Sequence, residues 1–166
     1  MLNGIRFVVL VTSDRAAAGV RPDAGGPRLE NWIKTHGGDC RETVVIPDDA
    51  QTIEAKILDY CRRDDIDVVL TTGGTGIGPR DVTVDVTQKL LEKELVGFGE
   101  VMRRRSLEVT PYAILSRATA GTRNGKLIVN LPGSPQGAVD CLACVSKPLV
   151  HAVEMLKQRV TDCPVQ

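Results

Sequence analysis

The sequence predicts an α/β fold, with a mostly parallel sheet and helices on both of its faces. Short apolar runs typical of strands recur along the chain, stretches with helical spacing lie between them, and the central run Val68–Leu70 is apolar on both faces. Such alternation indicates crossover connections between parallel strands. A length of 166 residues without a change in composition favours one domain over residues 1–160, with 161–166 as a frayed tail.

The first half of the chain contains three expected strands and two expected helices. Leu29 and Ile33 have helical spacing before the stop signal at Gly37, and Ile53 and Ile57 share the face of a second helix. The strands are rich in valine and isoleucine, which suits a pleated, buried surface. In chain order, the expected elements are a strand at 5–13, a helix at 27–38, a strand within 40–49, a helix at 50–64 and a strand at 66–72.

The second half of the chain contains one more expected strand, at 126–132, and is otherwise mostly helical. Helices are expected over 84–94 and 98–109. A longer helix should follow over 134–160, where Ser134 can act as its N-cap because proline suits the next position. Pro148 lies inside this stretch and is expected to kink or interrupt the helix.

Composition excludes several classes of function. Lys and Arg balance Asp and Glu at 21 each, so there is no basic excess of the kind that nucleic-acid binding requires, and aromatic residues make up only 3%. No apolar run approaches the roughly 18 residues of a membrane-spanning helix. We therefore expect neither a nucleic-acid nor a membrane partner.

The five cysteines are scattered and odd in number, which favours reduced thiols in the cytoplasm. Cys141 and Cys144 are spaced C-x-x-C, but no second pair exists and the two histidines do not complete a zinc spacing. On a helix these two cysteines would share a face, so we interpret them as small apolar core residues. His36 and His151 are expected to be ordinary surface or capping residues.

The stretch "TTGGTGIGPRD", residues 71–81, follows the central strand directly. It fits neither common nucleotide motif, because Pro79 replaces the third glycine of the dinucleotide fingerprint and "PR" replaces Lys-Ser/Thr of the phosphate loop. Two interpretations stay open. Glycine N–H groups can form a nest for phosphate oxygens, with glycine present because a side chain would block their approach. Alternatively, the stretch is a tight turn in which Asp81 caps the next helix.

The other strand ends favour the phosphate interpretation. Ser13 and Asp14 follow the first strand, and Asp48 and Asp49 follow the second. Because parallel strands end at one edge of a sheet, we expect these side chains and Asp81 to converge there. Carboxylates beside a phosphate-binding loop suit Mg²⁺-dependent phosphoryl or nucleotidyl transfer. Asp49 is the expected helix N-cap, which leaves Asp48 to face the site.

These blocks together resemble a known family. "VTSDR", "DAGGPRLENW", "TTGGTG", "RDVT", "ILSR" and "NLPGSP" occur in an order and spacing similar to those of the molybdopterin-binding domains of molybdenum-cofactor biosynthesis, the group of single-domain molybdopterin adenylyltransferases and gephyrin G domains. The resemblance covers nearly the whole chain. It implies a three-layer α/β/α fold, a homotrimer, and Mg²⁺-dependent transfer of AMP from ATP to the terminal phosphate of molybdopterin, with release of pyrophosphate. A downstream molybdate-insertion enzyme is a further implied partner.

The resemblance also implies roles for individual residues. Asp48 and Asp81 correspond to catalytic, metal-holding acids, and the glycine loop corresponds to the nucleotide-phosphate site. The expected substrate-binding residues are Ser13, Asp14, Ser106, Pro132, Gly133 and Ser134, and the expected nucleotide-binding residues are Gly73, Gly74, Thr75 and Gly76.

Two positions depart from the usual pattern of the family. Val84 stands where many relatives have proline, and "GSP" replaces the commoner "GNP". Neither departure removes a carboxylate or a loop glycine. An alternative remains open, in which the protein is a non-catalytic pterin-binding or scaffold trimer of the same fold.

Overall fold

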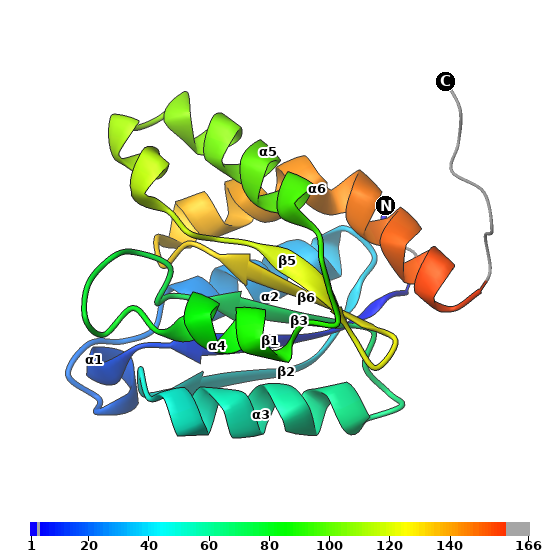
Figure 1. Cartoon of the computed structure of the whole chain (residues 1–166), viewed down its shortest axis with the longest axis horizontal. Coiled ribbons are helices and arrows are strands. Elements are labelled where there is room, and N and C mark those ends of the chain that lie inside the picture. The colour runs from blue at the N-terminus through cyan, green and yellow to red at the C-terminus, as the bar shows by residue number, and fades with distance from the viewer. Residues whose placement is uncertain (3, 159–166) are drawn as a thin grey trace.

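The structure is a computed structural model that describes residues 1–2 and 4–158 (Figure 1). Its strands are β1 (Arg6–Thr12), β2 (Asp39–Ile46), β3 (Val68–Thr72), β4 (Lys93–Glu94), β5 (Ala120–Arg123) and β6 (Lys126–Leu131). Its helices are α1 (Asp14–Ala17), α2 (Gly25–Thr35), α3 (Ala50–Arg62), α4 (Thr83–Leu90), α5 (Val96–Leu107), the 3₁₀ helix η1 (Pro111–Leu115) and α6 (Pro135–Leu156). The predicted tail, 161–166, lies outside the described residues.

The strands form one sheet in the order β2-β1-β3-β6-β5-β4. β2, β1, β3 and β6 are parallel neighbours, whereas β5 and β4 add an antiparallel edge. The predicted α/β class with a mostly parallel sheet is therefore confirmed. The parallel part matters for function, because it places the carboxyl ends of four strands along one edge.

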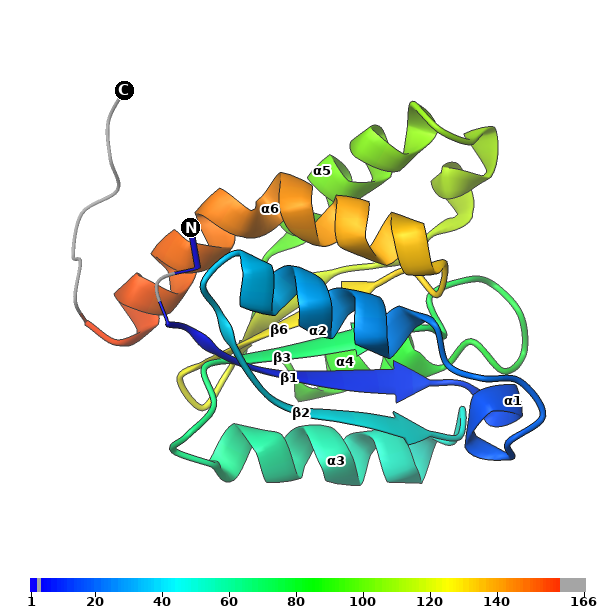
Figure 2. The same ribbon diagram turned by 180° about the vertical axis from the view of Figure 1, so that it is seen from behind.

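Helices cover both faces of the sheet, which gives the expected three layers. α2, α5 and α6 lie on one face, and α3 and α4 lie on the other (Figures 1 and 2). Residues of β1 alternate between the layers: Val9 packs in the cluster that contains α2 and α6, whereas Val8 and Leu10 pack in the cluster that contains α3 and α4. Burial on both faces explains why these strands are almost continuously apolar in the sequence.

The region between α4 and α5 differs from the sequence prediction. The helix expected over 84–94 ends at Leu90, and the chain then turns into the short strand β4 at Lys93–Glu94. β5 at Ala120–Arg123 was not predicted either. Both strands are short and belong to the sheet edge, so they carry little of the apolar pattern that identifies a buried strand.

Of the kink or interruption expected at Pro148, the interruption does not occur, because α6 runs without a break from Pro135 to Leu156. Proline inside a helix costs about 3 kcal/mol. Val145 and Leu149 on either side of it are buried in the core, and packing of this face holds the helix together across the missing hydrogen bond. The expected start is confirmed: the Ser134 side chain caps the helix, and Pro135 occupies its first turn.

The cysteine interpretation is confirmed for the described cysteines, which are all free thiols. Cys141 is buried in the hydrophobic cluster that also contains residues of α2 and α5. Cys144 is half-buried and packs against this cluster. His36 is the C-cap residue of α2, as expected for a capping histidine. Among the described residues, no helix is long and apolar enough to cross a membrane.

Candidate active site

The candidate site lies where β1, β2, β3 and β6 end. Backbone and side-chain hydrogen bonds join the segments that leave these strands: Ser13 N–H donates to the Ile46 carbonyl at 2.9 Å, and Thr72 Oγ1 donates to the Pro132 carbonyl at 2.7 Å. Gly73 N–H donates to the Leu131 carbonyl at 3.3 Å. The expected convergence of the four strand ends is therefore present in the fold.

Gly73 and Gly74, which open the glycine loop (residues 73–81), are required by the backbone itself. Their φ angles are +107° and +60°, which only glycine adopts readily. A Cβ atom at Gly73 would collide with the Thr12 carbonyl, and one at Gly74 would collide with the Thr83 side chain. We predicted from the sequence that glycine occurs here to let phosphate approach the backbone. The structure shows that backbone conformation and close packing already require glycine at both positions.

A buried polar network supports the loop from below. Thr12 Oγ1 and Thr83 Oγ1 are 3.0 Å apart, and Thr87 Oγ1 donates to the Thr83 carbonyl at 2.9 Å. The amide nitrogen of Asn130 contacts Thr71 Oγ1 at 2.8 Å and Thr87 Oγ1 at 2.9 Å. The sequence analysis did not predict this network. Polar residues at the ends of otherwise apolar strands are the feature that could have indicated it.

Asp81 does not cap α4. The N-cap residue of α4 is Val82, and no side chain provides a capping hydrogen bond there. Asp81 Oδ2 instead accepts a hydrogen bond from Gly78 N–H at 2.8 Å, within the loop. The helix-cap interpretation of Asp81 is therefore wrong, and its carboxylate lies against the glycines that precede it.

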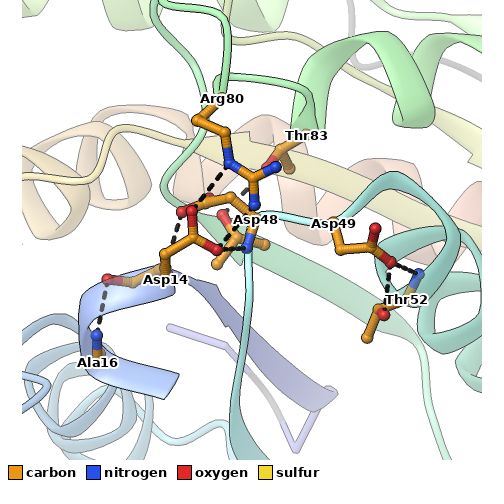
Figure 3. Close-up of polar contacts among 9 residues, drawn as sticks. Asp14, Ala16, Asp48, Asp49, Thr52, Arg80 and Thr83 are labelled. Carbon is orange, nitrogen blue, oxygen red and sulfur yellow. Dashed lines mark hydrogen bonds and ion pairs between the residues drawn. The ribbon is translucent and has the colours of Figure 1, made fainter. Parts of the chain in front are cut away.

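Asp14, Asp48 and Arg80 form a second group of charges at the rim (Figure 3). Asp14 N–H donates to Asp48 Oδ2 at 2.9 Å, and Asp48 N–H donates to Asp14 Oδ1 at 3.0 Å. Arg80 Nε and one terminal nitrogen each donate to the Asp14 carboxylate at 2.9 Å. Asp14 therefore joins the ends of β1 and β2 to the glycine loop.

The pKa values of these two acids move in opposite directions. The hydrogen bonds from Arg80 lower the pKa of Asp14, whereas burial raises the pKa of Asp48. The negative charges of Asp14 and Asp81 raise the pKa of Asp48 further. Of these two acids, Asp48 is the one whose charge the protein satisfies less, which is typical of a carboxylate that meets a cationic ligand.

Asp49 is the N-cap of α3, as the sequence predicted. Its Oδ2 accepts hydrogen bonds from Thr52 N–H at 2.8 Å and from Thr52 Oγ1 at 2.7 Å. These bonds lower the pKa of Asp49. The two adjacent aspartates therefore divide their tasks: Asp49 starts the helix, and Asp48 remains at the rim of the site.

The acids at the rim fit a magnesium ion that completes its coordination with phosphates and water. Among the described residues, no group of three or more acidic, histidine or cysteine side chains forms a metal cage. Asp48 accepts a hydrogen bond from Asp14 N–H and Asp81 accepts one from Gly78 N–H, each with one carboxylate oxygen, and no described group donates to the other oxygen of either acid. Mg²⁺ usually takes one or two carboxylates together with substrate phosphates, so this donor set suits it.

Two cavities flank the loops and are lined by most of the predicted binding residues, whereas the acids Asp14, Asp48 and Asp81 line neither of them. The first, of about 360 Å³, is lined by Ser106, Thr75, Gly76, Pro132 and Ser134. The second, of about 420 Å³, is lined by Ser13, Gly73 and Gly133. Gly74 is packed on Thr83 instead.

The walls of the first cavity are mostly apolar, with basic groups at one side. They include Met102, Leu115 and Ala118 together with Arg103 and Arg105. Ser106 Oγ lies 3.4 Å from the Cys141 thiol, whose pKa is raised by burial. A flat, uncharged ring system with a phosphate group would match this combination of surfaces.

Comparisons with known proteins show the family of this chain. A family model described as a probable molybdopterin binding domain matches residues 8–152. The chain belongs to this family. The family assignment confirms the resemblance that the loop motifs indicated.

Curated relatives of this molybdopterin-binding domain include two bacterial enzymes. A molybdopterin adenylyltransferase of Helicobacter pylori is 38% identical over 154 residues, which are 92% of this chain and 88% of the relative. A molybdopterin adenylyltransferase of Escherichia coli K12 is 41% identical over 143 residues, 85% of this chain and 73% of the relative. The crystal structure of the molybdopterin biosynthesis enzyme MoaB from Thermus thermophilus is 36% identical with a TM-score of 0.86, covering 93% of this chain and 97% of that one.

Proposed function

We propose that this molybdopterin-binding domain is a molybdopterin adenylyltransferase, which transfers AMP from ATP to the terminal phosphate of molybdopterin and releases pyrophosphate. The names of the relatives support the reaction. The observation that carries the proposal in this chain is the pair Asp48 and Asp81. Both carboxylates lie at the glycine-loop edge, and each keeps an oxygen without a donor from the described residues.

Each cavity is assigned one substrate. Molybdopterin occupies the first cavity, where Ser106 lies among apolar walls and Arg103 and Arg105 supply positive charge. ATP occupies the second cavity, with its phosphates toward Gly73 and Ser13. The turn Pro132–Ser134 contributes to both cavities, so the two substrates meet across it.

Asp48 and Asp81 would hold the magnesium ion. Bound there, Mg²⁺ supplies charge neutralisation at the phosphates of ATP. The partial burial that raises the pKa of Asp48 favours this role, because a cation relieves the cost of its half-buried negative charge. Asp14, whose carboxylate is occupied by Arg80, acts by holding the Asp48 backbone in place.

The remaining task of the protein is to orient the reacting groups. The nucleophile is a phosphate oxygen of molybdopterin, which is already ionised near neutral pH, so no side chain has to remove a proton from it. Alignment of this oxygen with the α-phosphate of ATP is what the two cavities provide. Backbone N–H groups of the glycine loop other than those of Gly73, Gly78 and Asp81, which already have acceptors, then donate to phosphate oxygens.

We also propose a homotrimer, as the family resemblance implied. Exposed apolar side chains gather on α5, η1 and the segment between them, and burial in a subunit contact would remove them from water. Light scattering that gives a monomer at assay concentrations would overturn this proposal. The exposed apolar residues are Val101, Leu107, Val109, Tyr112, Ile114 and Leu115.

Three further expectations remain proposals. Residues 1–160 form the single functional domain, a downstream molybdate-insertion enzyme receives the adenylylated product, and the protein works in the cytoplasm. The free thiols of the four described cysteines support a reducing compartment of this kind.

Single-turnover assays with ATP, Mg²⁺ and molybdopterin test the proposed reaction by following adenylylated molybdopterin. Asp81→Asn should reduce turnover by about 100-fold or more, because it removes an electrostatic group used mainly in the transition state. Molybdopterin affinity, measured by titration, should change little.

Asp49→Asn is the matched control, since asparagine caps a helix about as well as aspartate. This variant should keep the turnover of the wild-type protein. Binding of molybdopterin without any transfer by the wild-type protein would favour the non-catalytic alternative instead.

A further inference from the structure

Arg117, the last residue of the "ILSR" stretch, reaches the glycine loop from the segment that follows η1. Its Nε–H donates to the Gly76 carbonyl at 2.8 Å, and a terminal nitrogen donates to the Asp81 carbonyl at 2.5 Å. Its own backbone N–H donates to the Thr75 carbonyl at 2.9 Å. One residue therefore holds both ends of the segment 76–81.

The Arg117 guanidinium is itself fixed by Asp85, in the first turn of α4. The two terminal nitrogens donate to the two Asp85 oxygens at 2.7 and 3.0 Å. This pairing raises the pKa of Arg117 and lowers the pKa of Asp85, so both groups stay charged near neutral pH. The planar fork is thus oriented on one side by α4 and contacts the loop on the other.

The consequence falls on Asp81. Its backbone carbonyl is bound by Arg117, and its side chain returns to the loop through Gly78 N–H. We propose that Arg117 is a positioning residue that fixes the Asp81 carboxylate relative to the N–H groups of the glycine loop. This inference rests on the proposed function, which gives the position of Asp81 its catalytic meaning.

The geometry requires the arginine fork, beyond its positive charge. Three guanidinium nitrogens contact two backbone carbonyls and one carboxylate at the same time. A lysine ammonium is a single point on a flexible stem and cannot span these acceptors together. Arg117→Lys therefore separates the effect of charge from the effect of geometry.

A double-mutant experiment tests the proposal. Arg117→Lys and Arg117→Gln should each reduce single-turnover adenylyl transfer about tenfold or more, mainly in kcat, because hydrogen bonds that involve a charged group are strong. In an Asp81→Asn background the same substitutions should reduce transfer less than about twofold, since Arg117 acts through Asp81. Equal losses in the two backgrounds, or wild-type turnover in Arg117→Lys, would overturn the proposal.

Arg123→Gln provides the control. Arg123 also donates to a backbone carbonyl, that of Leu90 at 2.6 Å, but it belongs to the β5 edge and does not contact the loop. Its substitution removes the same kind of bond and should leave turnover unchanged. Melting curves for all variants give the share of folded protein in each assay.

Amide hydrogen exchange by NMR, without ATP, pterin or metal, gives a readout that is independent of turnover. Within the loop, Gly78 N–H donates to Asp81 Oδ2 and Asp81 N–H donates to the Gly78 carbonyl. Both amides should exchange about tenfold faster in Arg117→Lys or Arg117→Gln and at the wild-type rate in Arg123→Gln. Unchanged exchange in the Arg117 variants would refute the positioning role. A wild-type protein without turnover would refute only the proposed function.

Discussion

Asp67 and Asp48 lie at opposite ends of the same parallel sheet, and their surroundings differ. Asp67 precedes β3 and accepts hydrogen bonds from the Arg6 backbone and side chain, while Lys157 Nζ lies 2.7 Å from its Oδ1. Asp48 follows β2 and accepts one hydrogen bond, from Asp14 N–H. At the amino end of the sheet, the buried carboxylate of Asp67 is therefore paired with two cationic side chains. At the carboxyl end, the carboxylate of Asp48 has a single backbone donor.

The pKa values record this difference. Burial alone would raise the pKa of Asp67, but hydrogen bonds from Arg6 and Lys157 outweigh it and bring this pKa far below the usual range. Burial raises the pKa of Asp48, where no cation contacts the carboxylate directly. An acid whose oxygens all have partners contributes to stability, whereas an acid with a free oxygen at the carboxyl ends of the strands is available for a ligand.

The largest effect is expected for Asp67→Asn, which should lower the free energy of unfolding by about 3 kcal/mol, because it leaves Arg6 and Lys157 without their buried partner. Turnover per folded molecule should remain that of the wild type. Urea denaturation and the adenylyl-transfer assay measure the two quantities. Asp65→Asn is the control, since the exposed Asp65–Arg63 pair should contribute less than about 1 kcal/mol.

The pH dependence of stability should follow the sign of the Asp67 shift. Because its folded pKa is lowered, its contribution is complete above the unfolded pKa of about 4 and is lost as the pH falls toward the folded value. The stability of Asp67→Asn should therefore depend less steeply on pH in this acid range. An identical slope in both proteins would contradict the account of Asp67.

The sequence predicted the buried part of the fold and missed part of its edge. Val68–Leu70 is apolar because both faces of β3 are covered, and this pattern identifies a central strand directly. β4 has only the residues Lys93 and Glu94, which are exposed, so nothing in their types indicates a strand. Their pairing with β5 depends on residues almost thirty positions away, which local patterns do not reveal.

An effect of intermediate size is expected for Gly76→Ala. This substitution changes the glycine loop at the carboxyl end of the sheet without changing its charge. An added Cβ at Gly76 would lie 2.8 Å from Asp81 Oδ2, so the carboxylate has to move. Turnover should fall roughly tenfold, since a displacement of this kind weakens transition-state contacts, while stability changes by less than about 1 kcal/mol. Gly97→Ala is the control, because its Cβ would meet nothing within 4 Å.

Turnover of Gly76→Ala equal to that of the wild type would mean that the position of the Asp81 carboxylate is unimportant. It would also weaken the contrast between the two ends of the sheet. A large loss of stability in Gly76→Ala would instead show that the glycine loop has a mainly structural role, like the environment of Asp67.

The candidate site was predictable where a local rule applied. The division between Asp48 and Asp49 follows from N-cap preference, and the structure has this division. The same rule was misleading for Asp81, because α4 begins two residues later and has no side-chain cap. The contact of Arg117 with Gly76 joins residues 41 positions apart, so its effect on the loop could be found only in the folded chain.

The smallest effect is expected in the stability of Asp48→Asn. Because burial raises the folded pKa of Asp48, the native state binds this proton more tightly than the unfolded chain, and stability falls as the pH rises through the folded pKa. At neutral pH the ionised carboxylate is therefore destabilising. Asp48→Asn should raise the free energy of unfolding slightly at pH 7, and this gain should shrink as the pH is lowered toward about 4.

Asp49→Asn gives the neighbouring comparison for this last prediction. The hydrogen bonds from Thr52 lower the pKa of Asp49, so its ionised form stabilises the native state, and its replacement should give no gain at pH 7. Urea denaturation of both variants across this pH range measures the difference. If Asp48→Asn gains stability while it loses turnover, the same unsatisfied charge that weakens the fold is the one that serves the reaction. A loss of stability in Asp48→Asn would show that the protein stabilises the ionised carboxylate of Asp48, as it does that of Asp67.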